Sequence, residues 1–178
     1  KAIVSFKPDV VGVTATTLSY SRAINIMKGV KMLVPWALRI IGGVHVSCLP
    51  ESLDPVFDAA VLGDGEETLR EIVRMGNKDN LSEISGTCTF KKGQVVINPR
   101  SPVNLNTLPI PKLHLYAPLS YQNGNVGFIT SRGCPFQCVF CYSKVMRSRV
   151  DYYPVEWVAN QFEYAIKDLK VNFLVLWD

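Results

Sequence analysis

Residues 10–16 read Val-Val-Gly-Val-Thr-Ala-Thr, an apolar and β-branched run that follows Pro8-Asp9. A continuous run of this kind is typical of a strand that is buried on both faces of a parallel sheet. From residue 20 to about residue 34 the apolar residues recur at helical spacing, and Pro35 is expected to end that helix. The run therefore predicts the start of a strand–helix alternation.

The alternation continues toward the C-terminus. Residues 38–41 and 59–62 are two more short buried strands, and each ends at glycine-bearing turns. A short helix is expected near Pro50-Glu51, and a longer one from Glu66 to about Met75, where first-turn carboxylates complement the helix dipole. This order predicts an α/β fold with an open, doubly wound, Rossmann-like sheet.

Beyond this sheet the pattern changes twice. Residues 87–90 and 94–97 are β-rich and flank Lys91-Lys92-Gly93, as in a hairpin, and residues 98–118 carry five prolines, as in an extended linker. A new strand at 126–130, an amphipathic helix from 154 to about 170 and a strand at 173–177 follow. The chain is expected to divide into a Rossmann-like domain (1–80), a hairpin and linker (81–122) and the start of a second domain (123–178).

The length, net charge, hydropathy and cysteine count of the chain exclude several classes of protein. The chain has 178 residues and a net charge of +4, and its basic residues are scattered apart from Lys144, Arg147 and Arg149, so no nucleic-acid partner is indicated. No apolar run approaches the ~18 residues that span a bilayer. Three of the five cysteines fall within eight residues, a pattern that favours a metal site in a reducing, cytoplasmic setting over a disulfide framework. Because the first residue is Lys1, we expect a piece of a longer protein.

The three clustered cysteines lie in residues 130–142, Thr-Ser-Arg-Gly-Cys-Pro-Phe-Gln-Cys-Val-Phe-Cys-Tyr, directly after an expected strand. Thiolates are the soft ligands that iron–sulfur clusters and zinc select. Cys134, Cys138 and Cys141 could hold one 4Fe–4S cluster and leave one iron open for a small molecule. A zinc knuckle is the alternative, but its fourth ligand would have to come from residues without paired spacing. Three incidental buried thiols are a further alternative.

The spacing Cys-x-x-x-Cys-x-x-Cys, with Phe140 immediately before the third cysteine, resembles the signature of the radical S-adenosylmethionine (SAM) superfamily. The resemblance implies that the open iron binds SAM and that one electron from the reduced cluster releases a 5′-deoxyadenosyl radical. It also implies a place for Phe140 beside the adenine and for Asp178 near the amino group of SAM, in a partial TIM barrel. Core packing for Phe140 and an ordinary strand-end role for Asp178 are the alternatives. No catalytic residue is assigned.

The first domain carries a second resemblance. Gly42-Gly43-Val44-His45 and then Gly63-Asp64-Gly65-Glu66, where the family usually has Gly-Glu-Gly-Glu, resemble the cobalamin (B12)-binding domain found upstream of many radical enzymes. Open α/β sheets bind ligands at the carboxyl ends of their strands, where Thr14, Thr16, Gly42 and Gly43 are expected. These four are candidate contacts of a cobalamin nucleotide tail, and ligand-free turns are the alternative. The family's cobalt-ligating histidine would precede Lys1, and His45 lies in the wrong turn for that role.

The two resemblances together imply a cobalamin-dependent radical SAM enzyme, in some cases a methyltransferase acting on an unactivated carbon. Such an enzyme would need a small-molecule substrate and an electron donor such as a flavodoxin or ferredoxin. Residues 1–178 are expected to be inactive alone. Two alternatives stay open: a non-catalytic iron–sulfur module for electron transfer or binding, and a radical SAM enzyme of another reaction class with a cobalamin-free first domain. Cys48 and Cys88 are read as small buried residues.

Overall fold

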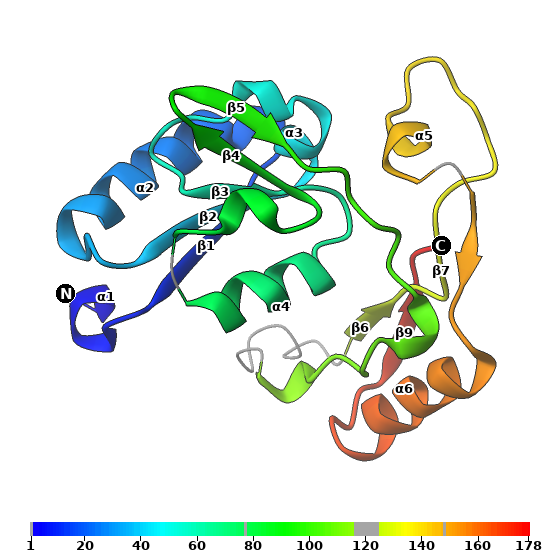
Figure 1. Ribbon diagram of the computed structural model, residues 1–178. Coiled ribbons are helices and arrows are strands. Elements are labelled where there is room, and N and C mark those ends of the chain that lie inside the picture. The colour runs from blue at the N-terminus through cyan, green and yellow to red at the C-terminus, as the bar shows by residue number, and fades with distance from the viewer. Residues whose placement is uncertain (1, 77, 116–124, 148) are drawn as a thin grey trace. The chain divides into compact units, whose positions relative to one another are not determined.

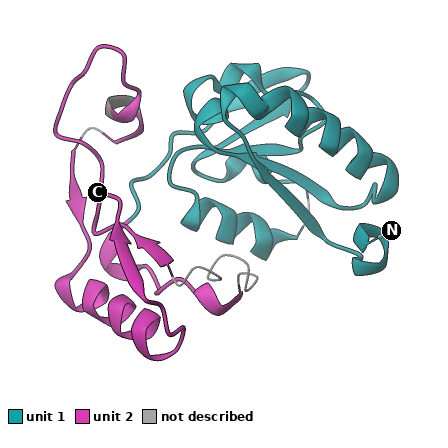
Figure 2. Cartoon of the chain, turned by 180° about the vertical axis from the view of Figure 1, so that it is seen from behind, with its two compact units in different colours: residues 1–103 teal, residues 104–178 magenta. Residues whose placement is uncertain are grey.

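The computed structural model describes residues 2–76, 78–115, 125–147 and 149–178, which form two compact units, Lys1–Val103 and Asn104–Asp178 (Figure 2). Residues 116–122 of the expected linker, with Pro118, and the first two residues of the expected second domain lie outside the described residues. The expected domain limits at 80 and 122 stay a prediction.

The first unit is built on a five-stranded mixed sheet whose strands follow in sequence order. The first three strands are parallel, and the last two add as an antiparallel hairpin. The strands are β1 (Val10–Thr14), β2 (Leu38–Gly42), β3 (Ala59–Val61), β4 (Thr87–Lys91) and β5 (Gln94–Ile97). The predicted α/β class is confirmed for this unit, and the hairpin extends the sheet.

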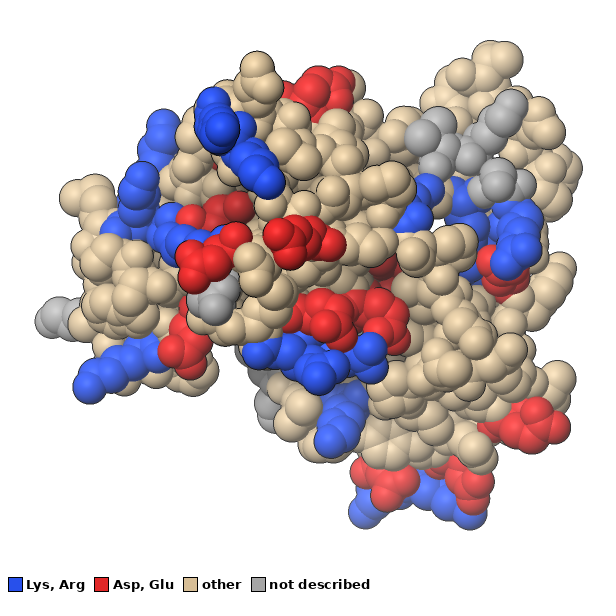
Figure 3. Space-filling model, in the orientation of Figure 1, with Lys and Arg blue, Asp and Glu red and all other residues tan. Residues whose placement is uncertain are grey.

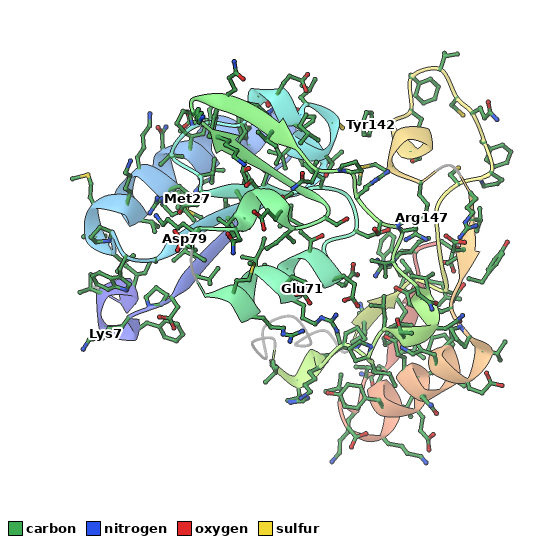
Figure 4. The ribbon with its side chains drawn as sticks, in the orientation of Figure 1. Lys7, Met27, Glu71, Asp79, Tyr142 and Arg147 are labelled. Atoms are coloured by element: carbon green, nitrogen blue, oxygen red, sulfur yellow. The ribbon has the colours of Figure 1, made fainter. Side chains whose placement is uncertain are left out.

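Helices cover both faces of this sheet (Figure 1). On one face α2 (Tyr20–Leu33) and α3 (Val44–Cys48) pack with Ile41, Ala60 and Cys88, and Met27 of α2, labelled in Figure 4, is only 1% exposed. On the other face α4 (Glu66–Met75) packs against Ile40, Ala59 and Val61. Neighbouring residues of β2 therefore enter opposite cores, which explains its uninterrupted apolar run. A short helix α1 (Ala2–Phe6) precedes β1.

Arg39 is the charged exception in β2, since it is 4% exposed. Its guanidinium pairs with Asp58 at 2.8 Å and donates to the carbonyls of Val56 and Ala37 at 2.7 and 3.0 Å. A buried charge that is paired and fully hydrogen-bonded avoids most of the desolvation cost. The pair thus ties the amino-terminal ends of β2 and β3 together.

Local details differ from the sequence-based expectations. β1 ends at Thr14 and not at residue 16, because Thr16 instead begins a 3-10 turn, Thr17–Ser19, in which its backbone N–H donates to Ser19 Oγ at 3.0 Å. The short helix near Pro50 is a 3-10 turn, Pro50–Ser52. Helix α3 was not predicted, because five residues are too few to show helical periodicity.

The second unit contains a parallel pair, β6 (Asn125–Phe128) and β9 (Phe173–Leu176), linked through α6 (Val155–Lys167). Val126 and Phe128 are buried with Ala165 of α6, and Phe128 lies 5.6 Å from the ring of Phe162. A small antiparallel ribbon, β7 (Ser131–Arg132) with β8 (Asp151–Tyr152), and a short helix α5 (Ser143–Met146) lie between β6 and α6. The expected βαβ piece is therefore present, with β6 ending two residues earlier than predicted.

The proline-rich segment is more ordered than a free linker. It forms two 3-10 turns, Leu105–Thr107 and Leu113–Leu115. Within the second unit Trp157 Nε1 donates to the Leu108 carbonyl at 2.8 Å, and the His114 Nδ1 to Tyr164 Oη distance is 2.6 Å. Proline prevented regular structure here, as predicted, but these side-chain bonds hold the segment against α6.

Acidic and basic side chains alternate on the face shown in Figure 3, and no continuous basic surface is visible there. On α4, Arg70 pairs with Glu67 and Arg74 pairs with Glu71, so the basic side chains of this helix are balanced by acidic ones. Within the described ranges, no helix is both long and apolar enough to cross a bilayer.

Candidate functional site

The carboxyl ends of β1 and β2 bring Thr14, Gly42 and Gly43 together. Thr14 pairs with Gly42 in the parallel register, and Ala15 N donates to the Gly42 carbonyl at 3.1 Å. Three of the four residues expected at this edge are thus adjacent. Thr16 lies further along the same loop, where its hydroxyl is 3.2 Å from Ser19 Oγ.

The two glycines of the turn have different reasons to lack a side chain. Gly43 has φ +100°, and a Cβ there would lie 2.6 Å from Thr14 Oγ1 and 2.7 Å from the Ala15 carbonyl oxygen. Any side chain at Gly43 would strain the turn with or without a ligand. A Cβ on Gly42 would meet only the Val61 carbonyl oxygen, at 3.9 Å. A Cβ at Gly42 would therefore make an ordinary van der Waals contact and would not strain the strand end.

This edge combines close-approach glycines with exposed hydroxyls. The half-buried backbone at Gly42 and Gly43 can be approached closely, and Thr14 and Thr16 are exposed hydroxyl-bearing residues beside it. Hydroxyls and close-approach glycines at the carboxyl ends of parallel strands suit a polar ligand such as a nucleotide-like tail. The residues present fit the tail of a cobalamin.

The cysteine loop lies in the second unit, between β7 and α5. All three thiols are free: Cys134 is half-buried, and Cys138 and Cys141 are exposed. Cys141 N donates to the Cys138 carbonyl at 3.0 Å, which turns the chain between these two residues. The Cys141 Sγ lies 3.2 Å from Ser143 Oγ, and the hydrogen bonds of the thiol with this side chain and with the Ser143 backbone lower its pKa.

The structure does not gather the three thiols into a ligand set. In the part of the chain that is described, no three His, Cys, Asp or Glu side chains are placed so that they could hold a metal ion. The donor chemistry nevertheless suits an iron–sulfur cluster, because three thiols on one exposed loop are free to act as soft ligands. Their role as ligands stays a prediction.

Both ends of this loop are held. Gly133, just before Cys134, has φ +112°, and a Cβ there would lie 2.0 Å from the Arg149 carbonyl oxygen. The β7–β8 pairing continues this close approach, with Arg132 opposite Asp151. Asp151 accepts hydrogen bonds from Arg149 and from Arg147, which is labelled in Figure 4. The two ends of the cysteine loop therefore meet at the backbone contact between Gly133 and Arg149.

Asp178 is also engaged. Its carboxylate accepts from the Thr130 backbone N–H and hydroxyl at 2.7 Å each, and from the Ser131 N–H and hydroxyl at 2.8 and 3.1 Å. These bonds, first that of the Thr130 hydroxyl, lower the pKa of Asp178. Both oxygens are occupied by the segment that leads into the cysteine loop. The expected contact with the amino group of SAM stays a prediction.

Phe140 and Cys88 differ in their exposure to solvent. Phe140 is 89% exposed, so the core-packing alternative does not describe it within this unit. Cys88 is fully buried in the first unit, burial raises its pKa to about 11, and its Sγ lies 3.2 Å from the Pro50 carbonyl oxygen. Cys88 is thus a core residue, as expected, whereas Cys48 is of intermediate exposure and not buried as expected.

Sequence reasoning missed the residues that hold these loops. Thr130 and Ser131 give no motif signal, because their partner Asp178 lies 48 and 47 positions away, respectively. Gly133 directly before the first cysteine is a signal that could have been read as a close backbone approach. His45, which the sequence only placed in the wrong turn for a cobalt ligand, is buried and contacts Thr17 and Ser52.

Comparison with known proteins supports the resemblance of the first unit to a B12-binding domain. Residues 1–73 match the sequence model of the B12 binding domain family. An uncharacterized methyltransferase of Pyrococcus horikoshii is 36% identical over 96% of this chain and 38% of the relative. An anaerobic magnesium-protoporphyrin IX monomethyl ester cyclase of Cereibacter sphaeroides is 27% identical over 97% of the chain and 30% of the relative.

A third relative is a cobalamin-dependent radical SAM methyltransferase of Streptomyces tokunonensis, 25% identical over 76% of the chain and 22% of the relative. The chain thus spans between 22% and 38% of the length of these three curated relatives. The similarity reaches well beyond the matched B12 binding domain and includes the cysteine loop in the first two relatives.

Proposed function

We propose that this chain, a homologue of cobalamin-dependent radical SAM enzymes, binds cobalamin through its first unit and a SAM-binding 4Fe–4S cluster through its second. The observation that carries the proposal is that a B12-type sheet and a Cys-x-x-x-Cys-x-x-Cys loop occur in one chain, in this order. The whole protein would then be a radical enzyme, and methyl transfer to an unactivated carbon is the reaction we favour.

The chain's own residues would divide the work as follows. Cys134, Cys138 and Cys141 would hold the cluster, and Gly133 and the β7–β8 ribbon would fix where their loop begins and ends. When bound, the cluster and SAM supply the 5′-deoxyadenosyl radical and cobalamin supplies a methyl group. The second unit's βαβ piece would be the first part of a partial TIM barrel, which its parallel β6–β9 pair supports.

In the first unit, Thr14, Thr16 and Gly42 would line the crevice for the nucleotide tail, and Gly43 would shape its turn. The exposed Phe140 would lie against the adenine of SAM. Asp178 would act first by holding residues 130 and 131, since its oxygens already accept four hydrogen bonds from them. An electron donor and a small-molecule substrate would complete the reaction.

Hydroxocobalamin binding tests the first half of this proposal. The 178-residue chain, mixed with hydroxocobalamin and passed through a gel-filtration column, should elute with corrin absorbance in the protein peak. A chain that elutes folded, by circular dichroism, and without corrin absorbance would contradict the cobalamin half and leave the cluster half standing, because the two rest on different residues.

A further inference from the structure

His45 is a buried, titratable side chain at the carboxyl edge of the sheet for which the proposed function has no role. It lies in α3, two residues after Gly43, and is 6% exposed. Its backbone N–H donates to the Ala15 carbonyl at 3.2 Å. A buried polar ring of this kind has to be satisfied by hydrogen bonds, and its partners show what it holds.

Both ring nitrogens contact hydroxyls from different segments. Nδ1 lies 3.1 Å from Thr17 Oγ1, in the loop after β1, and Nε2 lies 3.1 Å from Ser52 Oγ, in the 3-10 turn after α3. The ring of Tyr20 packs against that of His45 in a tilted arrangement, with a centroid distance of 3.9 Å. His45 thus joins three segments that are distant in sequence and that meet at the strand ends.

The hydrogen-bond directions place a proton on Nε2. Ser52 Oγ donates its proton to the Leu49 carbonyl at 2.6 Å, so toward the ring it can only accept, which requires a proton on Nε2. A neutral ring with Nε2–H leaves Nδ1 as an acceptor for the Thr17 hydroxyl. The Tyr20 hydroxyl donates to the Ser52 carbonyl at 2.7 Å and accepts from Asp54 N at 2.9 Å, which fixes the same turn.

We propose that His45 is a positioning residue of the cobalamin crevice. Through its backbone N–H and Nδ1 it holds Ala15 and Thr17, and these two residues flank Thr16 and follow Thr14. The exposed hydroxyls that line the crevice are thereby presented in one geometry before a ligand arrives, which lowers the entropic cost of binding. This inference rests on the proposed function, since it assigns His45 to the same crevice.

Three variants separate the effects of the two hydrogen bonds that the His45 ring makes, at Nδ1 and at Nε2. Thr17→Val removes the hydroxyl at an exposed position while it keeps the side-chain shape. His45→Asn can place an amide oxygen near the Nδ1 position, whereas His45→Gln reaches the Nε2 position and keeps only the Ser52 contact. The proposal therefore predicts that His45→Asn binds hydroxocobalamin more tightly than His45→Gln does.

The test is a hydroxocobalamin titration of the 178-residue chain and these variants, with melting temperature as the control for folding. Thr17→Val and His45→Gln should each weaken binding about tenfold, equivalent to ~1.4 kcal/mol, and the double variant should be no weaker than His45→Gln alone. His45→Asn should bind within about threefold of the wild type. If the wild type binds and Thr17→Val binds equally well, only the positioning role is overturned. If the wild type does not bind, the proposed function fails as well.

A second readout does not depend on cobalamin. Nitrogen NMR of the histidine-labelled chain at neutral pH should show His45 with a protonated Nε2 and an unprotonated Nδ1. Thr17→Val should then shift the Nδ1 resonance and leave that of Nε2 nearly unchanged. An Nδ1–H tautomer, or a doubly protonated ring, would overturn the assignment whatever the cobalamin result.

Discussion

Changing any one of Cys134, Cys138 and Cys141 to Ala should abolish iron–sulfur cluster assembly. Anaerobic reconstitution of the wild-type chain should give about four irons and four sulfides, because three thiolates are the fewest ligands that hold a site-differentiated cubane. A variant with two thiolates should lose nearly all of this iron. Iron and sulfide analysis, with the visible absorption of the cluster, measures the effect.

The matched control is Cys48→Ala, which removes a thiol of intermediate exposure in the first unit. It should leave the iron content unchanged. Cys88→Ala is a second control, with melting temperature as a check because Cys88 lies fully buried in the core. Loss of iron from a folded Cys88→Ala chain would indicate a fourth protein ligand, and stoichiometric zinc in the wild type would favour the zinc alternative.

A bulky residue at Gly42 should weaken hydroxocobalamin binding by more than about tenfold. A Cβ at Gly42 meets only the Val61 carbonyl oxygen, at 3.9 Å, so the turn should tolerate Gly42→Leu. The added side chain should then block binding directly, because it would occupy the space that the nucleotide tail needs. Gly43 is unsuitable for this test, because its φ of +100° and the contacts of a Cβ with Thr14 and Ala15 would strain any variant.

Gly29→Leu is the matched control, since Gly29 lies within α2 and a Cβ there meets no atom within 4 Å. It adds the same side chain away from the strand ends and should bind hydroxocobalamin as the wild type does. Equal binding by Gly42→Leu and Gly29→Leu, with both chains folded, would remove Gly42 from the crevice.

The sequence was sufficient to predict the elements that depend on local pattern. The parallel strands, the helix Glu66–Met75 and the hairpin follow from apolar runs, first-turn carboxylates and turn residues. The structure has them within two residues, and the two-residue differences are at the ends of β1 and β6. β1 ended early because Ser19 competes for the Thr16 N–H. Such a local side-chain bond is not visible in hydrophobic periodicity.

Contacts between distant segments were not predictable in the same way. The bonds of Asp178 to Thr130 and of His45 to Thr17 join residues that only the folded topology brings together. For the candidate site, the pattern of three cysteines identified the loop but not the restraints at Gly133 and Asp151 that hold it. The spacing of the cysteines indicates which side chains could bind a cluster, whereas the restraints on the loop depend on tertiary packing.

The most direct test of the central claim is the electron paramagnetic resonance spectrum of the reduced, reconstituted chain with and without SAM. Because three protein ligands leave one iron open, SAM should bind that iron and change the g-values of the reduced cluster. The Cys48→Ala chain should respond in the same way. A chain that holds about four irons and gives identical spectra with and without SAM would contradict the account and favour an electron-transfer cluster with four protein ligands.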